Sequence, residues 1–301
     1  MRESSAVRLA LIPAFAVASA LAVSSAPGIH AQASARERTI FVSALDSGDE
    51  PVNDLDPDDF VITEDGRRRE VLRVSRATEP MDIALLADNS KAAATAIGPM
   101  RSGLKDFVGE MAGDHQIALV GLADRPTILV NYTSNEMRLE EGINRLFGGS
   151  TSGMTLLDAL VEVSGGLRQR DATRAVIVPV ITTGIEFSNR YGLDVVDSLK
   201  QAGVALHALV LGVVGFGSVP ERERAVVLDA GSRETGGQHV TLLTDSAVRQ
   251  ALRKLARQLS AQYKVVYSRP ESLIPPEEIE VTTRRTGVLM RGTPARGQAG
   301  D

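Results

Sequence analysis

An apolar run that stops abruptly limits what this chain can fold into more than any other feature of the sequence. Residues 83–87 read Ile-Ala-Leu-Leu-Ala, and the next three residues are Asp88, Asn89 and Ser90. An unbroken apolar run of this length predicts a strand buried on both faces, as in a parallel sheet covered by helices. Open α/β sheets bind their ligands at the carboxyl ends of such strands. The polar triplet is therefore the first place to expect a binding site.

Strand and helix patterns alternate after this run. The strand patterns lie at residues 116–123, 126–132, 175–181, 204–211 and 238–243, and the helical patterns lie at 97–111, 139–147, from 156 onward, and 248–259. This alternation predicts an α/β, Rossmann-like, doubly wound and mostly parallel sheet over residues 80–260. The two closely joined strand patterns, 116–123 and 126–132, predict an antiparallel pair. Asp245 and Ser246 are expected to cap the last helix.

The segments on either side of this block have the two-residue period of strands. An Asp-Gly pair at residues 65–66 joins two of them and predicts a hairpin. The strands after the block are too few to form a stable sheet by themselves. We therefore expect the N-terminal β module, residues 34–79, to pair with residues 261–295, so that the α/β domain is inserted in a small split β-sandwich. The flanking strand patterns lie at residues 39–42, 58–64, 69–74, 263–267, 279–283 and 288–291.

The first residues have the pattern of an export signal. Arg2 and Arg8 precede an apolar stretch at residues 9–23, and residues 31–33, Ala-Gln-Ala, form a small-x-small cleavage pattern. Residues 1–33 are therefore predicted to be a signal peptide, and a transmembrane anchor is the alternative. No later segment is long and apolar enough to cross a membrane. We expect an exported protein, periplasmic or secreted, with a disordered tail at residues 296–301.

Composition and motif order argue against several classes of function. The chain has no cysteine, which excludes disulfides, thiolate catalysis and cysteine-based zinc sites. A net charge of −5 without a basic cluster is not the footprint of a nucleic-acid-binding protein. The four histidines are scattered without metal-ligand spacing, and His207 reads as a core residue. The sequence contains no phosphate loop, dinucleotide loop or nucleophile elbow, so we expect a non-enzymatic protein.

Three motifs resemble those of the von Willebrand factor A domain, and more closely those of the bacterial exported group of VWFA-related proteins. Residues 88–92, Asp-Asn-Ser-Lys-Ala, are similar to the family's Asp-x-Ser-x-Ser, and residues 153–160 are similar to its second loop. Residues 182–184, Thr-Thr-Gly, stand where the family has Thr-Asp-Gly. The flanking residues 58–66 and 262–267 also resemble that group. The resemblance covers nearly all of the mature chain and implies the vWA fold.

In that family the three loops form a metal-ion-dependent adhesion site for Mg²⁺. The resemblance implies that Ser90 and Thr155 are direct ligands and that Asp88 holds a water or orients them. Ala92 replaces the last serine of the first motif, and Thr183 replaces the aspartate of the third, so a hydroxyl and a negative charge are missing. We therefore expect a degenerate, metal-free polar loop, with weak Mg²⁺ binding as the alternative.

The leading functional hypothesis is a non-enzymatic, exported interaction or adhesion-type module. It would contact an unidentified protein partner, and neither nucleic acid nor a membrane, through the three loops. The loop residues expected to contact this partner are Asn89, Lys91, Thr183 and Glu186. Two alternatives stay open. One is a structural scaffold that binds through its β module, and the other is a hydrolase that uses Asp88 and Ser90.

Overall fold

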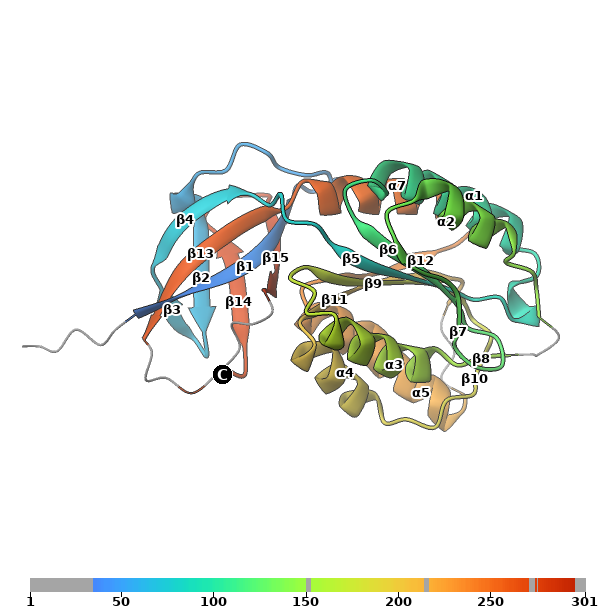
Figure 1. Ribbon diagram of the computed structural model, residues 1–301. Helices are drawn as coiled ribbons and strands as arrows, with labels where there is room; N and C mark the ends of the chain where they lie inside the picture. Colours follow the sequence, from blue (N-terminus) through green and yellow to red (C-terminus); the bar gives the residue numbers. More distant parts are fainter. Residues whose placement is uncertain (1–34, 150–152, 214–216, 271–273, 275, 296–301) are drawn as a thin grey trace, which may run out of the picture. The chain divides into compact units, whose positions relative to one another are not determined.

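The computed structural model of the protein describes residues 35–149, 153–213, 217–270, 274 and 276–295 (Figure 1). The export signal expected at residues 1–33 and the tail expected at residues 296–301 lie outside the described residues. Within the described part of the chain, no helix combines the length and the apolar content needed to span a bilayer.

A six-stranded sheet forms the α/β domain, in the order β12-β11-β9-β5-β6-β7 (Figure 1). Its neighbouring strands are parallel except β6 and β7, which confirms the predicted antiparallel pair. The strands are β5 (Asp82–Ala87), β6 (Gln116–Gly121), β7 (Thr127–Thr133), β9 (Ala175–Thr182), β11 (Val204–Leu211) and β12 (Gln238–Leu242). Because β5 and β9 are parallel neighbours at the middle of the sheet, the loops that follow them leave the sheet side by side.

Helices cover both faces of this sheet, and the side chains of β5 alternate between two cores. Ile83 and Leu85 pack with one group of helices, whereas Ala84 and Leu86 pack with the other. The first group is α1 (Ile97–Met111), α2 (Glu136–Asn144) and α7 (Ala247–Ser260), and the second includes α3 (Leu156–Gln169) and α4 (Gly192–Gln201). Helix α5 (Val219–Val226) continues through a π-helical turn, Val227–Gly231, into α6 (Ser232–Glu234). The mostly parallel, doubly wound fold is thus confirmed.

The prediction that the Ser246 side chain caps the last helix is wrong. Ser246 is the N-cap residue of α7, but its side chain makes no capping hydrogen bond to the helix. Its backbone is already helical, with φ −65° and ψ −23°, whereas a capping side chain is normally placed by an extended backbone. The Ser246 hydroxyl instead lies 3.1 Å from the hydroxyl of Thr244.

Strands from both ends of the described chain build the two sheets of the β-sandwich. One sheet has the order β15-β1-β13-β4, and the other has the order β14-β2-β3. The strands are β1 (Ala35–Leu45), β2 (Phe60–Glu64), β3 (Arg67–Arg69), β4 (Val71–Arg76), β13 (Tyr263–Pro270), β14 (Ile279–Thr283) and β15 (Leu289–Pro294). Because β1 pairs with β13 and β15, and β2 pairs with β14, each sheet needs strands from both sides of the α/β domain.

The Asp-Gly hairpin is present, but its second strand is shared between the two sheets. Asp65 and Gly66 both have positive φ, as a tight two-residue hairpin turn requires. The predicted strand at residues 69–74 is interrupted at Glu70. Before this residue β3 pairs with β2, and after it β4 pairs with β13 in the other sheet. The strand therefore turns a corner of the sandwich, which a two-residue period does not reveal.

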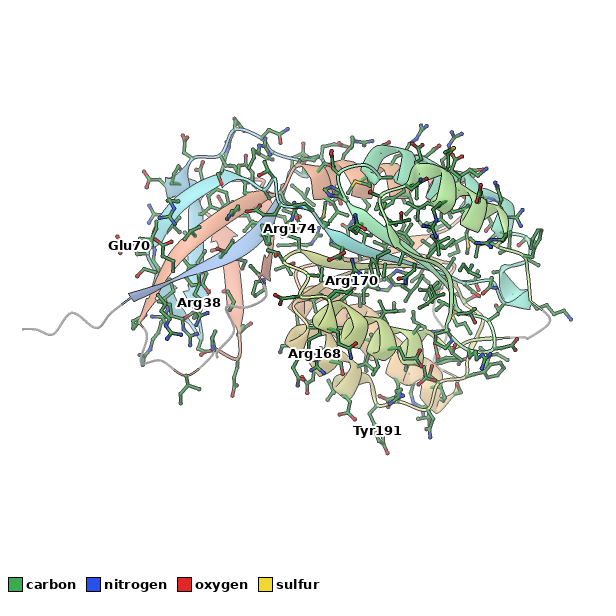
Figure 2. All side chains as sticks on the ribbon, in the orientation of Figure 1. Arg38, Glu70, Arg168, Arg170, Arg174 and Tyr191 are labelled. Atoms are coloured by element: carbon green, nitrogen blue, oxygen red, sulfur yellow. The ribbon has the colours of Figure 1, made fainter. Side chains whose placement is uncertain are left out.

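Arg174 links the two places where the chain passes between the sandwich and the α/β domain (Figure 2). Its Nη1 donates to the carbonyl oxygen of Glu79 at 2.7 Å, before β5. Its Nη2 donates to Gln262 Oε1 at 2.8 Å and to the carbonyl oxygen of Leu259 at 3.2 Å, beside β13. The guanidinium also lies over the ring of Phe41, and burial lowers the pKa of Arg174 to about 10. One buried cation thus holds both connecting segments.

A buried carboxylate, Glu64, connects the two sheets of the sandwich. The Tyr267 hydroxyl donates to Glu64 Oε1 at 2.9 Å, and Arg69 Nε donates to Glu64 Oε2 at 2.8 Å. Arg269 Nε lies 3.2 Å from the same Oε2 atom. Burial and the nearby Glu64 charge raise the pKa of Tyr267 above its ordinary value. Glu64 is therefore a single acceptor shared by residues of β3 and β13.

We expect Glu64→Gln to lower the free energy of unfolding by about 3–5 kcal/mol, because it leaves buried arginines without their counter-charge. Urea denaturation followed by circular dichroism measures this change. Glu37→Gln is the matched control, since Glu37 pairs with Arg73 on the surface and its removal should leave stability nearly unchanged. Equal effects of the two substitutions would contradict the role given to Glu64.

Candidate functional site

Three loops meet at the carboxyl end of the parallel sheet, and we call residues 88–92, 153–155 and 182–186 the strand-end loops. A Cβ atom added to Gly184 would lie 2.9 Å from the Cβ of Ala92 and 3.6 Å from Cε of Met154. The second and third loops also pair directly, since β8 (Gly153–Met154) is parallel to β10 (Ile185–Glu186). The three motifs identified in the sequence are therefore neighbours in the structure.

Asp88 is fully buried, and both of its carboxylate oxygens accept hydrogen bonds. Oδ1 accepts from the backbone N–H of Ser90 at 2.9 Å. Oδ2 accepts from the backbone N–H of Thr182 at 3.1 Å and from the Thr182 hydroxyl. Hydrogen bonds to an ionised acceptor are stronger than neutral ones. Asp88 consequently fastens the first loop to the end of β9.

Ser90 and Thr155, the two expected direct metal ligands, have different surroundings. The hydroxyl of Ser90 is buried and has no hydrogen-bond partner among the described residues. The hydroxyl of Thr155 donates to the carbonyl oxygen of Leu122 at 3.1 Å. Ser90 contributes an unpaired oxygen, whereas Thr155 joins the second loop to the end of β6.

Two residues expected to contact a partner point into the protein instead. Asn89 Oδ1 accepts from the backbone N–H groups of Leu122 and Ala123, each at 2.9 Å. Glu186 is buried, and its Oε1 accepts from the backbone N–H of Ser188 at 3.1 Å. The partners of Asn89 lie 33 and 34 residues further along the chain, so its position in a loop did not reveal these hydrogen bonds. Lys91 and Thr183, in contrast, are exposed.

A buried arginine from α5, Arg224, lies against the third loop and was not singled out in the sequence. Its side chain is fully buried, and Nη1 donates to the carbonyl oxygen of Gly184 at 2.6 Å. Its Nε and Nη2 atoms have no hydrogen-bond partner among the described residues. Burial lowers the pKa of Arg224, and the negative charges of Glu186, Glu221 and Asp88 act in the opposite direction. The polar sequence of α5 contains no signal that this arginine is buried.

The donor set of the strand-end loops does not fit the Mg²⁺ that the resemblance implies. Both oxygens of Asp88 are already acceptors for backbone and hydroxyl groups. Thr183 supplies no charge, and Arg224 brings a positive charge to the same loop. In the part of the chain that the structure describes, no group of three or more Asp, Glu or His side chains is placed to hold a metal. A hard dication needs more negative oxygen than these residues offer.

The geometry around Ser90 does not resemble a hydrolytic site. The carboxylate of Asp88 accepts from the backbone N–H of Ser90, not from its hydroxyl. No described residue is hydrogen-bonded to that hydroxyl as a general base would be. His207 is buried within β11, where burial lowers its pKa to about 3, as expected of a core histidine.

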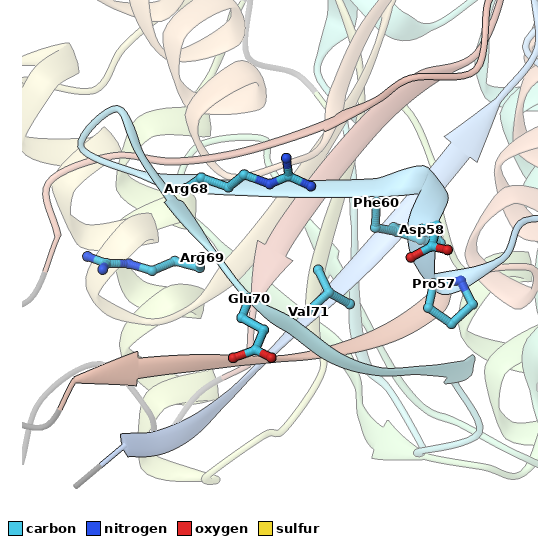
Figure 3. Close-up of a pocket in the computed structure, with 7 residues that line it drawn as sticks. All are labelled: Pro57, Asp58, Phe60, Arg68, Arg69, Glu70 and Val71. Atoms are coloured by element: carbon cyan, nitrogen blue, oxygen red, sulfur yellow. The ribbon is translucent and has the colours of Figure 1, made fainter. Parts of the chain in front are cut away.

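Two hollows lie outside the strand-end loops. One, of about 470 Å³, belongs to the β module (Figure 3) and is lined by Pro57, Asp58, Phe60, Arg68, Arg69, Glu70 and Val71. The other, of about 600 Å³, lies between β7, at the edge of the six-stranded sheet, and α3, with Ile128, Tyr132 and Val163 in its lining. Neither lining includes a histidine or a serine.

Exposed apolar side chains surround the strand-end loops, and we call Ile185, Phe187, Val213 and Leu243 the apolar rim. Their exposed fractions are 46, 49, 76 and 83%. The segments that carry them touch one another. A Cβ on Gly212 would lie 3.0 Å from Cγ2 of Thr183, and the Gly212 N–H donates to the carbonyl oxygen of Leu242 at 2.9 Å. The four exposed apolar side chains therefore lie on neighbouring segments at the carboxyl end of the sheet.

We expect Asp88→Ala to lower the free energy of unfolding by about 3 kcal/mol, because it leaves buried donors of Ser90 and Thr182 without an acceptor. Ser90→Ala should have little effect, since it removes a hydroxyl that has no hydrogen-bond partner among the described residues. Urea denaturation of both variants measures the difference. A large loss in Ser90→Ala would show that its hydroxyl has a partner.

No protein-family model and no curated protein matches the chain in sequence. In structure the chain is similar to proximal thread matrix protein 1 from the mussel byssus, at a TM-score of 0.51 and 17% identity. That protein was solved with zinc in its metal-ion-dependent adhesion site (MIDAS) motif. The likeness covers 69% of this chain and 50% of the mussel protein, so the chain spans about half of that protein's length.

Weaker likenesses, at TM-scores of 0.48 and 0.42, are to the vWF domain of the type V pili tip protein Mfa5 from Porphyromonas gingivalis and to the SpRpn10 VWA domain. They have 11 and 13% identity and cover 61 and 56% of this chain, against 96 and 93% of the other chains. At such identities a likeness concerns the fold alone. The sheet order, the two helical layers and the likeness to the mussel protein agree, and this chain contains a domain with the von Willebrand factor A fold.

Proposed function

We propose that this chain is an exported, non-enzymatic interaction module that contacts a protein partner through its strand-end loops. The observation that carries the proposal is the apolar rim, which exposes large apolar side chains where open α/β sheets bind their ligands. The absence of a hydrogen-bonded base beside Ser90 among the described residues supports a non-enzymatic role. Export is proposed from the sequence pattern of residues 1–33.

The proposed contact does not depend on a divalent metal, because we infer that the adhesion site is degenerate. In metal-dependent members of the family, the ion leaves one position for an acidic group of the partner. Here Ala92 and Thr183 replace a hydroxyl and a carboxylate, and Asp88 is committed to internal hydrogen bonds. The partner is therefore recognised by apolar contact with the rim, and exposed Lys91 favours a negative charge at its edge.

A scaffold that binds through the β module is the second candidate. The observation that favours it is the hollow of about 470 Å³ beside β3, which is an edge strand of its sheet. Arg68 and Glu70 give this hollow charges of both signs. Edge strands also offer unpaired backbone groups to a partner strand. The two candidates place the contact on different surfaces, so a position-specific experiment separates them.

Titration of the purified protein with Mg²⁺ or Mn²⁺ should give no saturable heat, and its melting temperature should be the same with either ion as with EDTA. The reason is that an ion stabilises a protein only in proportion to its occupancy of the folded state. Calorimetry and thermal melts provide the two readings. Saturable heat that disappears in Asp88→Ala would overturn the proposed metal independence.

Photo-crosslinking tests where the partner binds. We expect a photo-reactive phenylalanine analogue in place of Phe187 or Val213 to give adducts of one common mass in cells that export the protein. The same analogue in place of Met137, an exposed residue of α2, is the control and should give none. Adducts from Leu72 of β4, with none from Phe187 and Val213, would favour the scaffold and contradict the proposed loop contact.

A further inference from the structure

We propose that Arg224 supplies, from inside the protein, the positive charge that a divalent metal supplies in the metal-dependent sites of this fold. This inference rests on the proposed metal independence of the strand-end loops, but not on any property of the partner. Arg224 would hold the third loop in place and repel a second cation.

The position of Arg224 is held by the ends of α5. Ser218 and Glu221 form a capping box at its start: the Ser218 hydroxyl accepts from the Glu221 N–H at 3.3 Å, and Glu221 Oε2 accepts from the Ser218 N–H at 3.0 Å. Later in the helix, Glu223 Oε2 accepts from the Gly192 N–H at 2.6 Å, which joins α5 to α4. These hydrogen bonds fix the start of α5 and join it to α4, and so they position Arg224 beside Gly184.

Arg224 is a buried cation whose counter-charges lie at a distance. The guanidinium is fully buried, yet no carboxylate of the described residues lies within 4.0 Å of it in an ion pair, and its one hydrogen bond goes to the carbonyl oxygen of Gly184. Three carboxylates, those of Asp88, Glu186 and Glu221, act on it electrostatically from farther away.

Thr183 and Arg224 both make the charge at the third loop less negative. Thr183 removes a negative charge from the third loop, and Arg224 adds a positive charge whose hydrogen bond falls on the next residue, Gly184. A buried charge acts strongly on its neighbours because the surrounding dielectric constant is low. Restoring the missing ligands alone should therefore not restore metal binding. Removing the positive charge as well should restore it.

The test compares A92S/T183D with A92S/T183D/R224M by calorimetric titration of the full chain with Mg²⁺. We expect the triple variant to bind at least ~10-fold more tightly than the double variant, since tenfold corresponds to about 1.4 kcal/mol, a modest interaction between buried charges. Mg²⁺ should raise the melting temperature of the triple variant only. A92S/T183D/R222M is the matched control, because exposed Arg222 lies on the same helix and its loss changes the net charge equally.

Equal Mg²⁺ affinity of the double and triple variants would overturn the proposal, as would a folded triple variant that binds no Mg²⁺. Should the triple variant not fold, the single variants Arg224→Lys and Arg224→Met decide the matter. A higher melting temperature for Arg224→Lys supports a role for the charge, and equal losses overturn it. These results are distinct from a test of the proposed metal independence itself. That proposal would be contradicted by Mg²⁺ binding to the unaltered protein.

Discussion

The arrangement of the strand-end loops depends on one buried carboxylate, Asp88. Its oxygens accept from the backbone of Ser90 and from both donors of Thr182, so it joins the ends of β5 and β9. Asp88 is fully buried, and its two oxygens accept three hydrogen bonds from the chain. A buried carboxylate needs such partners, because it has no contact with water. The loops are therefore ordered by hydrogen bonds of the chain itself.

These internal hydrogen bonds explain why loops with a polar sequence expose several apolar side chains. Polar groups of the loops are turned inward: Asn89 toward the end of β6, Glu186 toward Ser188, and Arg224 toward Gly184. Among the described residues of these loops, the exposed side chains are those of Lys91, Ala92, Thr183 and Ile185, and Ile185 belongs to the apolar rim. Such side chains are consistent with the proposed protein partner, since affinity between proteins depends on a few buried anchor residues.

The β-sandwich and the α/β domain depend on each other because the chain crosses between them twice. Each sheet of the sandwich contains strands from before and after the α/β domain. Arg174 binds both crossings, and Glu64 holds residues of β3 and β13 together. The two segments are far apart in sequence, so closing the sandwich also closes the loop formed by the whole inserted domain.

The sequence by itself determined the alternation of buried strands and helices, the antiparallel pair of β6 and β7, and the split sandwich, because hydrophobic period is a local property. Only the tertiary structure decided that Arg224 is buried, that Asn89 and Glu186 point inward, and that β3 and β4 part at Glu70. Each of these depends on which distant segments pack together. The polar sequence of α5 is typical of an exposed helix, and only its contact with Gly184 places one of its charges inside the protein.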